Sequence, residues 1–172
     1  MNRYCITDSL DVVLRAAQRG ATMLQIRAKD ISARALADLV RAAVASASCP
    51  VLVNTRTDVA LACGAQGVHL PSRSIAPRTI RRIAPPGFLI GVSCHTAAEL
   101  RQAENEGADL AVFGPIFPSS SKPVTPLGTE ALREAISTVR LPVYALGGIT
   151  RDNERLCIEA GAAGIAGISF FS

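Results

Sequence analysis

A Gly-Ala pair recurs four times along the chain, each time between an amphipathic segment and a short apolar run. The pairs begin at Gly20, Gly64, Gly107 and Gly161, and each is followed within three residues by a run such as MLQI, GVHL, LAVF or GIAGI. Glycine is favoured just past the end of a helix, and a small alanine beside it lets helix and strand approach closely. A repeat of this kind predicts structural units that stack into one architecture.

The chain contains eight short apolar runs in all, because a further run precedes each Gly-Ala unit. The runs are apolar almost throughout, which predicts parallel strands that are buried on both faces. With two strands per repeat, we predict an α/β fold of the closed (β/α)8 or TIM-barrel class. An open doubly wound sheet is the alternative, but no glycine-rich dinucleotide turn follows the first strand. The expected strands are residues 3–7, 23–27, 50–54, 67–70, 88–93, 110–114, 142–148 and 164–169.

The length of 172 residues predicts a single, compact barrel domain over residues 1–172. Only a few residues follow the eighth expected strand, so we expect the barrel to lack its final helix. The Phe170-Phe171 pair is then expected to be exposed and to suit a contact in a homodimer. A trimmed C-terminus would explain the same pattern.

Composition excludes several classes of partner. The net charge of +4 comes from scattered arginines without interleaved aromatic residues, which argues against nucleic-acid binding and favours a small anionic phosphate ligand. No run of about 18 apolar residues predicts a membrane span. The five cysteines are odd in number and form no C-x-x-C motif, so we expect buried thiols in a cytoplasmic protein and no structural metal.

The ends of the last two expected strands predict a phosphate site, because barrels of this class often bind phosphate there. Gly147 and Gly148 would let backbone N–H groups reach an anion, and Ser169 adds a hydroxyl. A helix expected to open at Thr150 would add its dipole. The alternative is that the glycines simply form a tight turn.

Two other segments at this end of the barrel also suit an anion. Residues 114–128 form a long proline-rich loop whose serines and Lys122 fit a phosphate clamp, although a solvated loop is the simpler alternative. Gln25, Arg27 and Lys29 alternate along the second strand, so their side chains face one direction and offer two cations and an amide. Ion pairs with acids such as Asp30 would also explain them. The third and fifth strands supply Asn54 and Ser93.

The chain has two histidines, His69 on the fourth strand and His95 just past the fifth. Either can transfer a proton near neutral pH, so both are candidate catalytic residues. A structural role is the alternative for each. Cys94 precedes His95, but neighbours on a strand point apart, which argues against a Cys–His nucleophile pair.

The motifs LQIRAKD, VNTRTDVALACGAQGVHL, GVSCHT, FGPIFPSSSK and ALGGIT together resemble the thiamine phosphate synthase/TenI superfamily, in the same order over nearly the whole chain. The synthase joins an aminopyrimidine diphosphate to a thiazole phosphate and releases diphosphate. The resemblance implies that the pyrimidine diphosphate would contact Gln25, Arg27, Lys29, Asn54, Ser93 and Lys122. It implies that the thiazole phosphate would contact Ser119, Ser121, Gly148, Ile168 and Ser169.

Two departures from the synthase pattern shape the functional hypothesis. The synthase motifs place Mg²⁺-binding aspartates where this chain has Thr55 and Ser74, and hydroxyls are poorer ligands for this ion. The stretch HLPSRS instead is similar to the TenI branch, although that branch has a histidine at the position of Pro115.

We therefore expect a TenI-like thiazole tautomerase, an isomerase that binds a carboxythiazole phosphate and aromatises it without metal or cofactor. His69, or else His95, would move the proton. The alternatives are a thiamine phosphate synthase, which would need Mg²⁺, and a non-catalytic ligand-binding or regulatory protein. A generic sugar-phosphate isomerase also remains open, because the barrel alone does not exclude it.

Overall fold

The computed structural model describes residues 1–119 and 124–171 and contains a closed barrel of eight parallel strands. Each strand pairs with the next one in the sequence, and β8 pairs with β1 through registers such as Arg3 opposite Ile165. The predicted TIM-barrel class is confirmed, and the expected strand boundaries differ from the observed ones by at most two residues. The strands are β1 (Asn2–Thr7), β2 (Met23–Ile26), β3 (Val51–Asn54), β4 (Gly67–Leu70), β5 (Leu89–Cys94), β6 (Leu110–Phe113), β7 (Val143–Leu146) and β8 (Gly164–Gly167).

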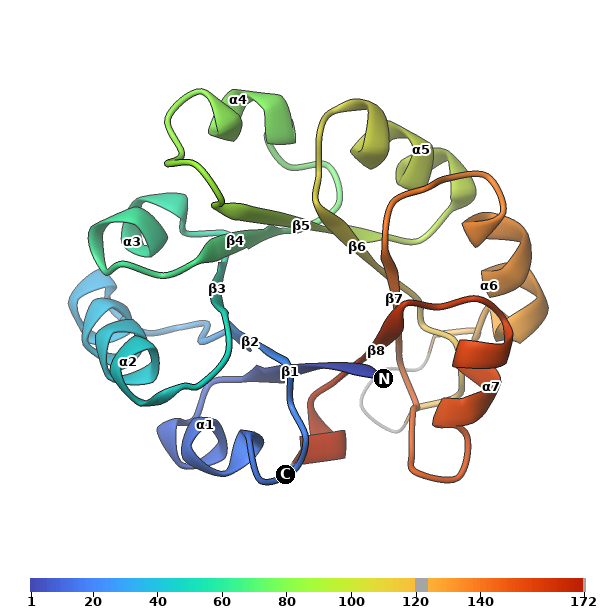
Figure 1. Ribbon diagram of the computed structural model, residues 1–172, viewed down its shortest axis with the longest axis horizontal. Coiled ribbons are helices and arrows are strands. Elements are labelled where there is room, and N and C mark those ends of the chain that lie inside the picture. Colours follow the sequence, from blue (N-terminus) through green and yellow to red (C-terminus); the bar gives the residue numbers. More distant parts are fainter. Residues whose placement is uncertain (120–123, 172) are drawn as a thin grey trace.

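Within the described residues, seven α-helices form a ring around the barrel (Figure 1). Most are short, and only α2 exceeds nine residues, which explains how the fold fits into so few residues. The helices are α1 (Leu10–Ala16), α2 (Ala33–Ser46), α3 (Thr57–Ala62), α4 (Pro77–Arg81), α5 (Ala97–Asn105), α6 (Gly128–Ile136) and α7 (Glu154–Glu159).

The Gly-Ala repeat ends helices α1, α3, α5 and α7 in the same way. The four repeat glycines have φ between 72° and 103°, a left-handed conformation that carries no Cβ penalty in glycine. The alanine N–H after each glycine donates to the carbonyl five residues earlier, at 2.9–3.0 Å, which is the Schellman bond of a helix C-terminus. Each Gly-Ala pair therefore ends a helix and leads the chain directly into the strand that follows.

Alternate residues of the strands build two separate apolar clusters. Cys5 packs in the layer between strands and helices, whereas Tyr4 and Ile6 point into the barrel. The interior cluster is completed by Met23, Leu52, Leu110, Val112, Tyr144 and Ala166. These side chains fill the barrel below its C-terminal end, so that a ligand site is confined to that end.

A 3-10 helix, η1 (Ser169–Phe171), follows β8, and no eighth α-helix is present among the described residues. The expectation that both phenylalanines are exposed is wrong, because Phe171 is 1% exposed. Phe170 lies under the guanidinium groups of Arg3 and Arg151, whose Cζ atoms are 5.7 and 4.3 Å from the ring centre. Both arginines also reach Glu154, at 2.9 and 3.9 Å.

Figure 1 shows the C-terminus beside α1, so this short segment occupies part of the interval between α7 and α1. The homodimer stays a prediction.

The helix expected to open at Thr150 begins later. Residues 150–153 form a turn in which the Asn153 side chain accepts the Thr150 N–H at 2.8 Å, and α7 starts at Glu154. Because α7 has only six residues, we assign no dipole contribution to the neighbouring glycine loop. Ser32 and Thr96 cap α2 and α5, since the side chain of each accepts a backbone N–H from three residues later at 3.1 Å.

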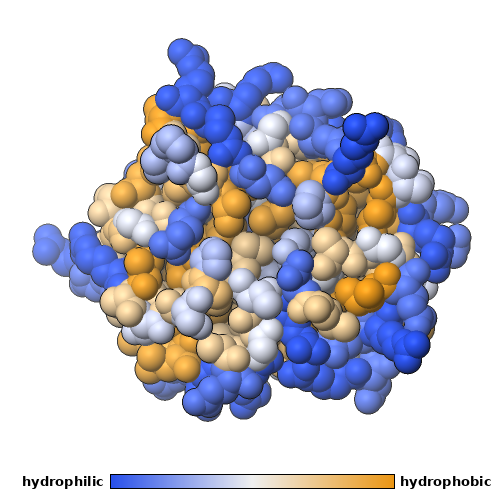
Figure 2. Space-filling view, in the orientation of Figure 1, coloured by the Kyte–Doolittle hydropathy of each residue, from blue (hydrophilic) through white to orange (hydrophobic). Residues whose placement is uncertain are grey.

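Charged side chains gather at the edge of the molecule. In Figure 2 the strongly hydrophilic residues project around the periphery, and more apolar residues lie toward the middle of the face in view. Within the described part of the chain, no helix has both the length and the apolar character needed to cross a membrane. All five cysteines are free thiols, and four of them are buried, as expected.

Candidate active site

A cavity of about 420 Å³ opens at the C-terminal ends of the strands. All eight strands or the loops directly after them contribute to its lining. Its size suits a small organic phosphate. The site therefore lies where barrels of this class generally place their chemistry.

Most of the predicted site residues meet in this cavity. Eleven of the fourteen line it: Gln25, Arg27, Asn54, His69, Ser93, His95, Ser119, Gly147, Gly148, Ile168 and Ser169. Lys29 is exposed and lies outside the lining, so the alternation from Gln25 does not carry it into the site. Ser121 and Lys122 lie outside the described residues, and their predicted roles stay predictions.

The floor of the cavity is made by His69 together with partners on neighbouring and opposite strands. The His69 Nε2 atom lies 2.9 Å from Ser93 Oγ, and its Nδ1 atom lies 3.3 Å from the Tyr4 hydroxyl. Burial, and secondarily the positive charge of Arg27, lowers the pKa of His69 to about 3. His69 is therefore a neutral imidazole at physiological pH and a poor general acid.

His95 lies at the rim, where its side chain is exposed. Its Nδ1 atom donates to the carbonyl oxygen of Gly114 at 2.7 Å, and its backbone N–H donates to the carboxylate of Glu99. These bonds orient the ring and link β5, the start of α5 and the end of β6. The two histidines thus differ in environment: His69 is buried, whereas His95 is exposed to solvent.

Gly147 and Gly148 form a turn against the loop after β6. Both have positive φ, 101° and 63°. A Cβ on Gly148 would collide with the carbonyl oxygen of Pro118, and a Cβ on Gly147 would come within 2.6 Å of the Pro115 side chain. The tight-turn interpretation is therefore correct in itself, and it also brings bare backbone to the cavity wall.

Tyr4 was not among the residues expected at the site, yet it is fully buried inside the barrel and hydrogen-bonded to His69. The signal was present in the first strand, where Tyr4 and Ile6 alternate with Arg3 and Cys5. An aromatic hydroxyl at an inward position needs a partner, and only the register of the closed barrel shows which residue supplies it.

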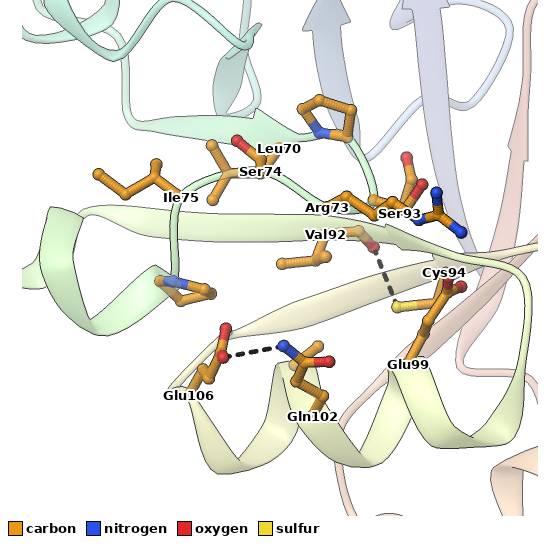
Figure 3. A pocket seen from close by; sticks show the side chains of 14 residues that line it. Leu70, Arg73, Ser74, Ile75, Val92, Ser93, Cys94, Glu99, Gln102 and Glu106 are labelled. Atoms are coloured by element: carbon orange, nitrogen blue, oxygen red, sulfur yellow. Dashed lines mark hydrogen bonds between the residues drawn. The ribbon is translucent and has the colours of Figure 1, made fainter.

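A second cavity, of about 390 Å³, lies between the β4–α4 loop and α5 (Figure 3). Arg73 and Ser74 come from the loop, and Glu99, Gln102 and Glu106 come from the helix. The Gln102 amide donates to Glu106 at 3.0 Å, so one of the two carboxylates on this side of the cavity already accepts a hydrogen bond from within α5. Ser74, which takes the place of a metal ligand in the synthase pattern, faces this side cavity.

The residues present do not fit a magnesium site of the synthase type. Thr55 and Ser74 offer hydroxyls in place of carboxylates, and Asn54 donates its amide to Thr55 at 3.1 Å. The nearby Asp58 is held by Arg56 in two hydrogen bonds of 2.8 and 2.6 Å, which lowers the pKa of Asp58 to about 2. Over the described ranges, no group of three His, Cys, Asp or Glu side chains could hold a metal ion.

Comparison with known proteins identifies the family to which this barrel belongs. A family model described as thiamine monophosphate synthase matches residues 2–171. The chain belongs to this family. It is 41% identical over 179 residues to a putative thiamine-phosphate synthase 2 of Aquifex aeolicus, covering 98% of this chain and 96% of the relative.

Two further matches support the same assignment. A thiamine-phosphate synthase of Chlorobium luteolum is 44% identical over 168 residues, which cover 95% of this chain and 79% of the relative. A solved structure of a thiamine phosphate pyrophosphorylase from Pyrococcus furiosus superimposes with a TM-score of 0.87 at 34% identity, over 98% of this chain and 85% of that one.

These comparisons overturn the expectation of a TenI-like thiazole tautomerase. The two relatives are named thiamine-phosphate synthases, which are transferases, and the solved structure is named a thiamine phosphate pyrophosphorylase. The neutral, buried state of His69 argues in the same direction, since it removes the preferred proton carrier of the tautomerase hypothesis. The short stretch HLPSRS and the hydroxyls of Thr55 and Ser74 favoured the TenI branch, whereas the similarity over nearly the whole chain is to proteins named synthases.

Proposed function

We propose that the protein acts as a thiamine-phosphate synthase, joining an aminopyrimidine diphosphate to a thiazole phosphate. One observation supports the proposal: a single cavity has two different walls whose groups each suit a phosphate. Gln25, Arg27 and Ser93 lie on the wall formed by β2–β5, and Gly148 and Ser169 lie on the wall formed by β7–β8. Two phosphorylated substrates, bound one at each wall, would meet between them.

The reaction requires little acid–base catalysis from the protein. The bond between the exocyclic methylene of the pyrimidine and the diphosphate oxygen breaks, and its electron pair leaves on the diphosphate. The thiazole nitrogen supplies the electron pair of the new carbon–nitrogen bond, so no proton has to move. What the site must supply is alignment of the two rings and stabilisation of the departing negative charge.

Side chains of the β2–β5 wall suit the second task. Arg27 is a permanent cation at the cavity, and a guanidinium can form paired, charge-assisted hydrogen bonds to diphosphate oxygens. The Ser93 hydroxyl adds a neutral donor beside it. No step is assigned to magnesium, because the residues at positions 55 and 74 do not offer the carboxylates of the synthase pattern.

The test is direct synthesis. The purified protein is incubated with both substrates in buffer containing Mg²⁺, and thiamine phosphate and released diphosphate are quantified over time. We expect the two products to appear in equal amounts and at a rate that depends on enzyme concentration. Binding of both substrates without any product would overturn the synthase proposal and favour the non-catalytic alternative.

A further inference from the structure

Four polar side chains form a continuous hydrogen-bonded chain across the barrel interior. Gln25 Nε2 lies 3.2 Å from the Tyr4 hydroxyl, Tyr4 lies 3.3 Å from His69 Nδ1, and His69 Nε2 lies 2.9 Å from Ser93 Oγ. The residues come from β2, β1, β4 and β5, so the chain runs from one side of the barrel to the other. Gln25, Tyr4 and His69 are each at most 2% exposed, whereas Ser93 is partly exposed at the cavity.

The number of protons in this chain is fixed. Burial raises the pKa of the Tyr4 phenol far above its ordinary value, so the hydroxyl keeps its proton. His69 is neutral and carries one N–H. Each of these two groups can therefore donate in one direction only. If all three hydrogen bonds are made, the donors must point either all toward Ser93 or all toward Gln25.

An anionic ligand selects between the two directions. Ser93 lines the same cavity as the Arg27 cation, so an anion held there favours a hydroxyl that donates to it. Ser93 then has to accept from His69 Nε2–H, which leaves His69 Nδ1 to accept from Tyr4. Tyr4 in turn accepts from the Gln25 amide nitrogen, as the observed amide orientation has it.

We propose that Tyr4 is a positioning residue that, together with the bound anion, holds His69 in its Nε2–H tautomer and thereby holds the Ser93 hydroxyl as a donor to the diphosphate of the substrate. This inference rests on the proposed function for the identity of the anion. Tyr4 touches no substrate atom in this scheme and acts through His69. Through this chain of hydrogen bonds, the Tyr4 hydroxyl on the first strand helps determine that Ser93 donates a hydrogen bond to the ligand.

The same orientation gives the other end of the chain a role. The Gln25 oxygen Oε1 is the one buried side-chain polar atom, among those described, that has no hydrogen-bond partner. Gln25 lines the cavity, and an unpaired buried acceptor is costly. A ligand with an N–H donor, such as an amino-substituted ring, would satisfy it. The chain would therefore offer an acceptor at Gln25 and a donor at Ser93.

The test is the tautomeric state of His69, measured by nitrogen-15 NMR of the imidazole rings with inorganic diphosphate as the probe. The protein contains only two histidines, and a His95→Gln variant assigns the signals. With diphosphate bound, we expect the His69 signals of the Nε2–H tautomer. The Nδ1–H tautomer in the bound state would overturn the proposal. Absence of diphosphate binding would also overturn it, since no anion would then set the direction.

Tyr4→Phe removes the hydroxyl and keeps the ring. We expect this variant to lose the tautomer preference, with kcat/KM for the diphosphate substrate falling about fivefold or more, the size of one net hydrogen bond. Tyr144→Phe is the matched control, because Tyr144 lies inside the same barrel with its ring 6.0 Å from that of Tyr4 and its hydroxyl bonds to Asn2. An unchanged tautomer in Tyr4→Phe, or an equal change in Tyr144→Phe, would contradict the proposal. The spectra need no turnover, so the tautomer of His69 can be measured even if the synthase assay fails.

Discussion

The two walls of the active-site cavity are built on different principles. The wall from β2 to β5 presents side chains, among them Arg27, His69 and Ser93, and a hydrogen bond joins the last two. The wall from β7 to β8 presents bare backbone at Gly147 and Gly148, because the loop after β6 packs on these two residues and leaves no room there for a Cβ.

The difference shows two ways to fix a binding surface. A side-chain wall owes its precision to partners, so substitution there removes a particular interaction and leaves the fold in place. A backbone wall owes its precision to close packing, so substitution there moves the chain itself. We therefore expect variants of the backbone wall to lose stability and variants of the side-chain wall to lose activity.

Gly148→Ala should have the largest effect, because the new methyl group meets the carbonyl of Pro118 at a residue with φ of 63°. We expect the free energy of unfolding to fall by about 3 kcal/mol, from overpacking and left-handed backbone strain together, with loss of thiazole-phosphate binding. Denaturant melts of the variant measure the change.

Gly64→Ala is the matched control for that substitution, since Gly64 has φ of 72° but nothing within 4 Å of a Cβ. It should lose only about 1 kcal/mol, the strain of the left-handed conformation. Equal losses in the two variants would show that packing at the backbone wall contributes nothing.

Arg27→Met tests the side-chain wall. Removing the guanidinium should lower kcat/KM for the pyrimidine diphosphate by about 100-fold, the size expected for a charged donor to an anion, while the melting transition changes little. Arg78→Met, on the exposed side of α4, provides a control of the same charge change away from the cavity. An Arg27 variant with full activity would place the diphosphate elsewhere.

The pH dependence of stability tests the dry environment of His69. Its folded-state pKa, about 3, lies below its unfolded value, so the unfolded chain binds a proton first as the pH falls. The free energy of unfolding should therefore drop by about 2 kcal/mol between roughly pH 7.5 and pH 5, and it should recover as the pH rises. His69→Gln should flatten this slope in urea melts at a series of pH values. A slope that persists unchanged in the variant would mean that another group is responsible.

Asp58→Asn should have the smallest effect. The carboxylate is exposed and paired with Arg56, so its loss should leave both stability and the rate of product formation in Mg²⁺-containing buffer close to wild type. A large rise in the Mg²⁺ concentration needed for activity would instead identify Asp58 as a metal ligand and would add a carboxylate function to the side-chain wall.

The fold was predictable because its signals are local and repeated. Each Gly-Ala pair ends a helix through one backbone geometry, and the strands are apolar enough to require cover on both faces. The placement of η1 was not predictable, because Phe170 lies under Arg3 and Arg151, and Arg3 on β1 comes beside the C-terminal segment only when β8 pairs with β1.

The site was predictable as a set of positions, and less so as chemistry. Strand ends converge in any parallel barrel, which is why eleven of the fourteen expected residues line the cavity. The roles of the histidines depend on solvation, and sequence does not show that His69 is dry and bonded to Tyr4. Lys29 was misplaced because the alternation of a strand was extended past Ile26, where β2 ends.

Phe170 has a consequence for how binding and stability are linked. Its ring lines the cavity and also lies under Arg3 and Arg151, which both reach Glu154 beside the β8–β1 junction. A ligand that orders this ring should slow hydrogen exchange of the amides in β1 and β8 as well as those at the cavity. Occupancy of the active site would then be measurable at the line where the barrel closes.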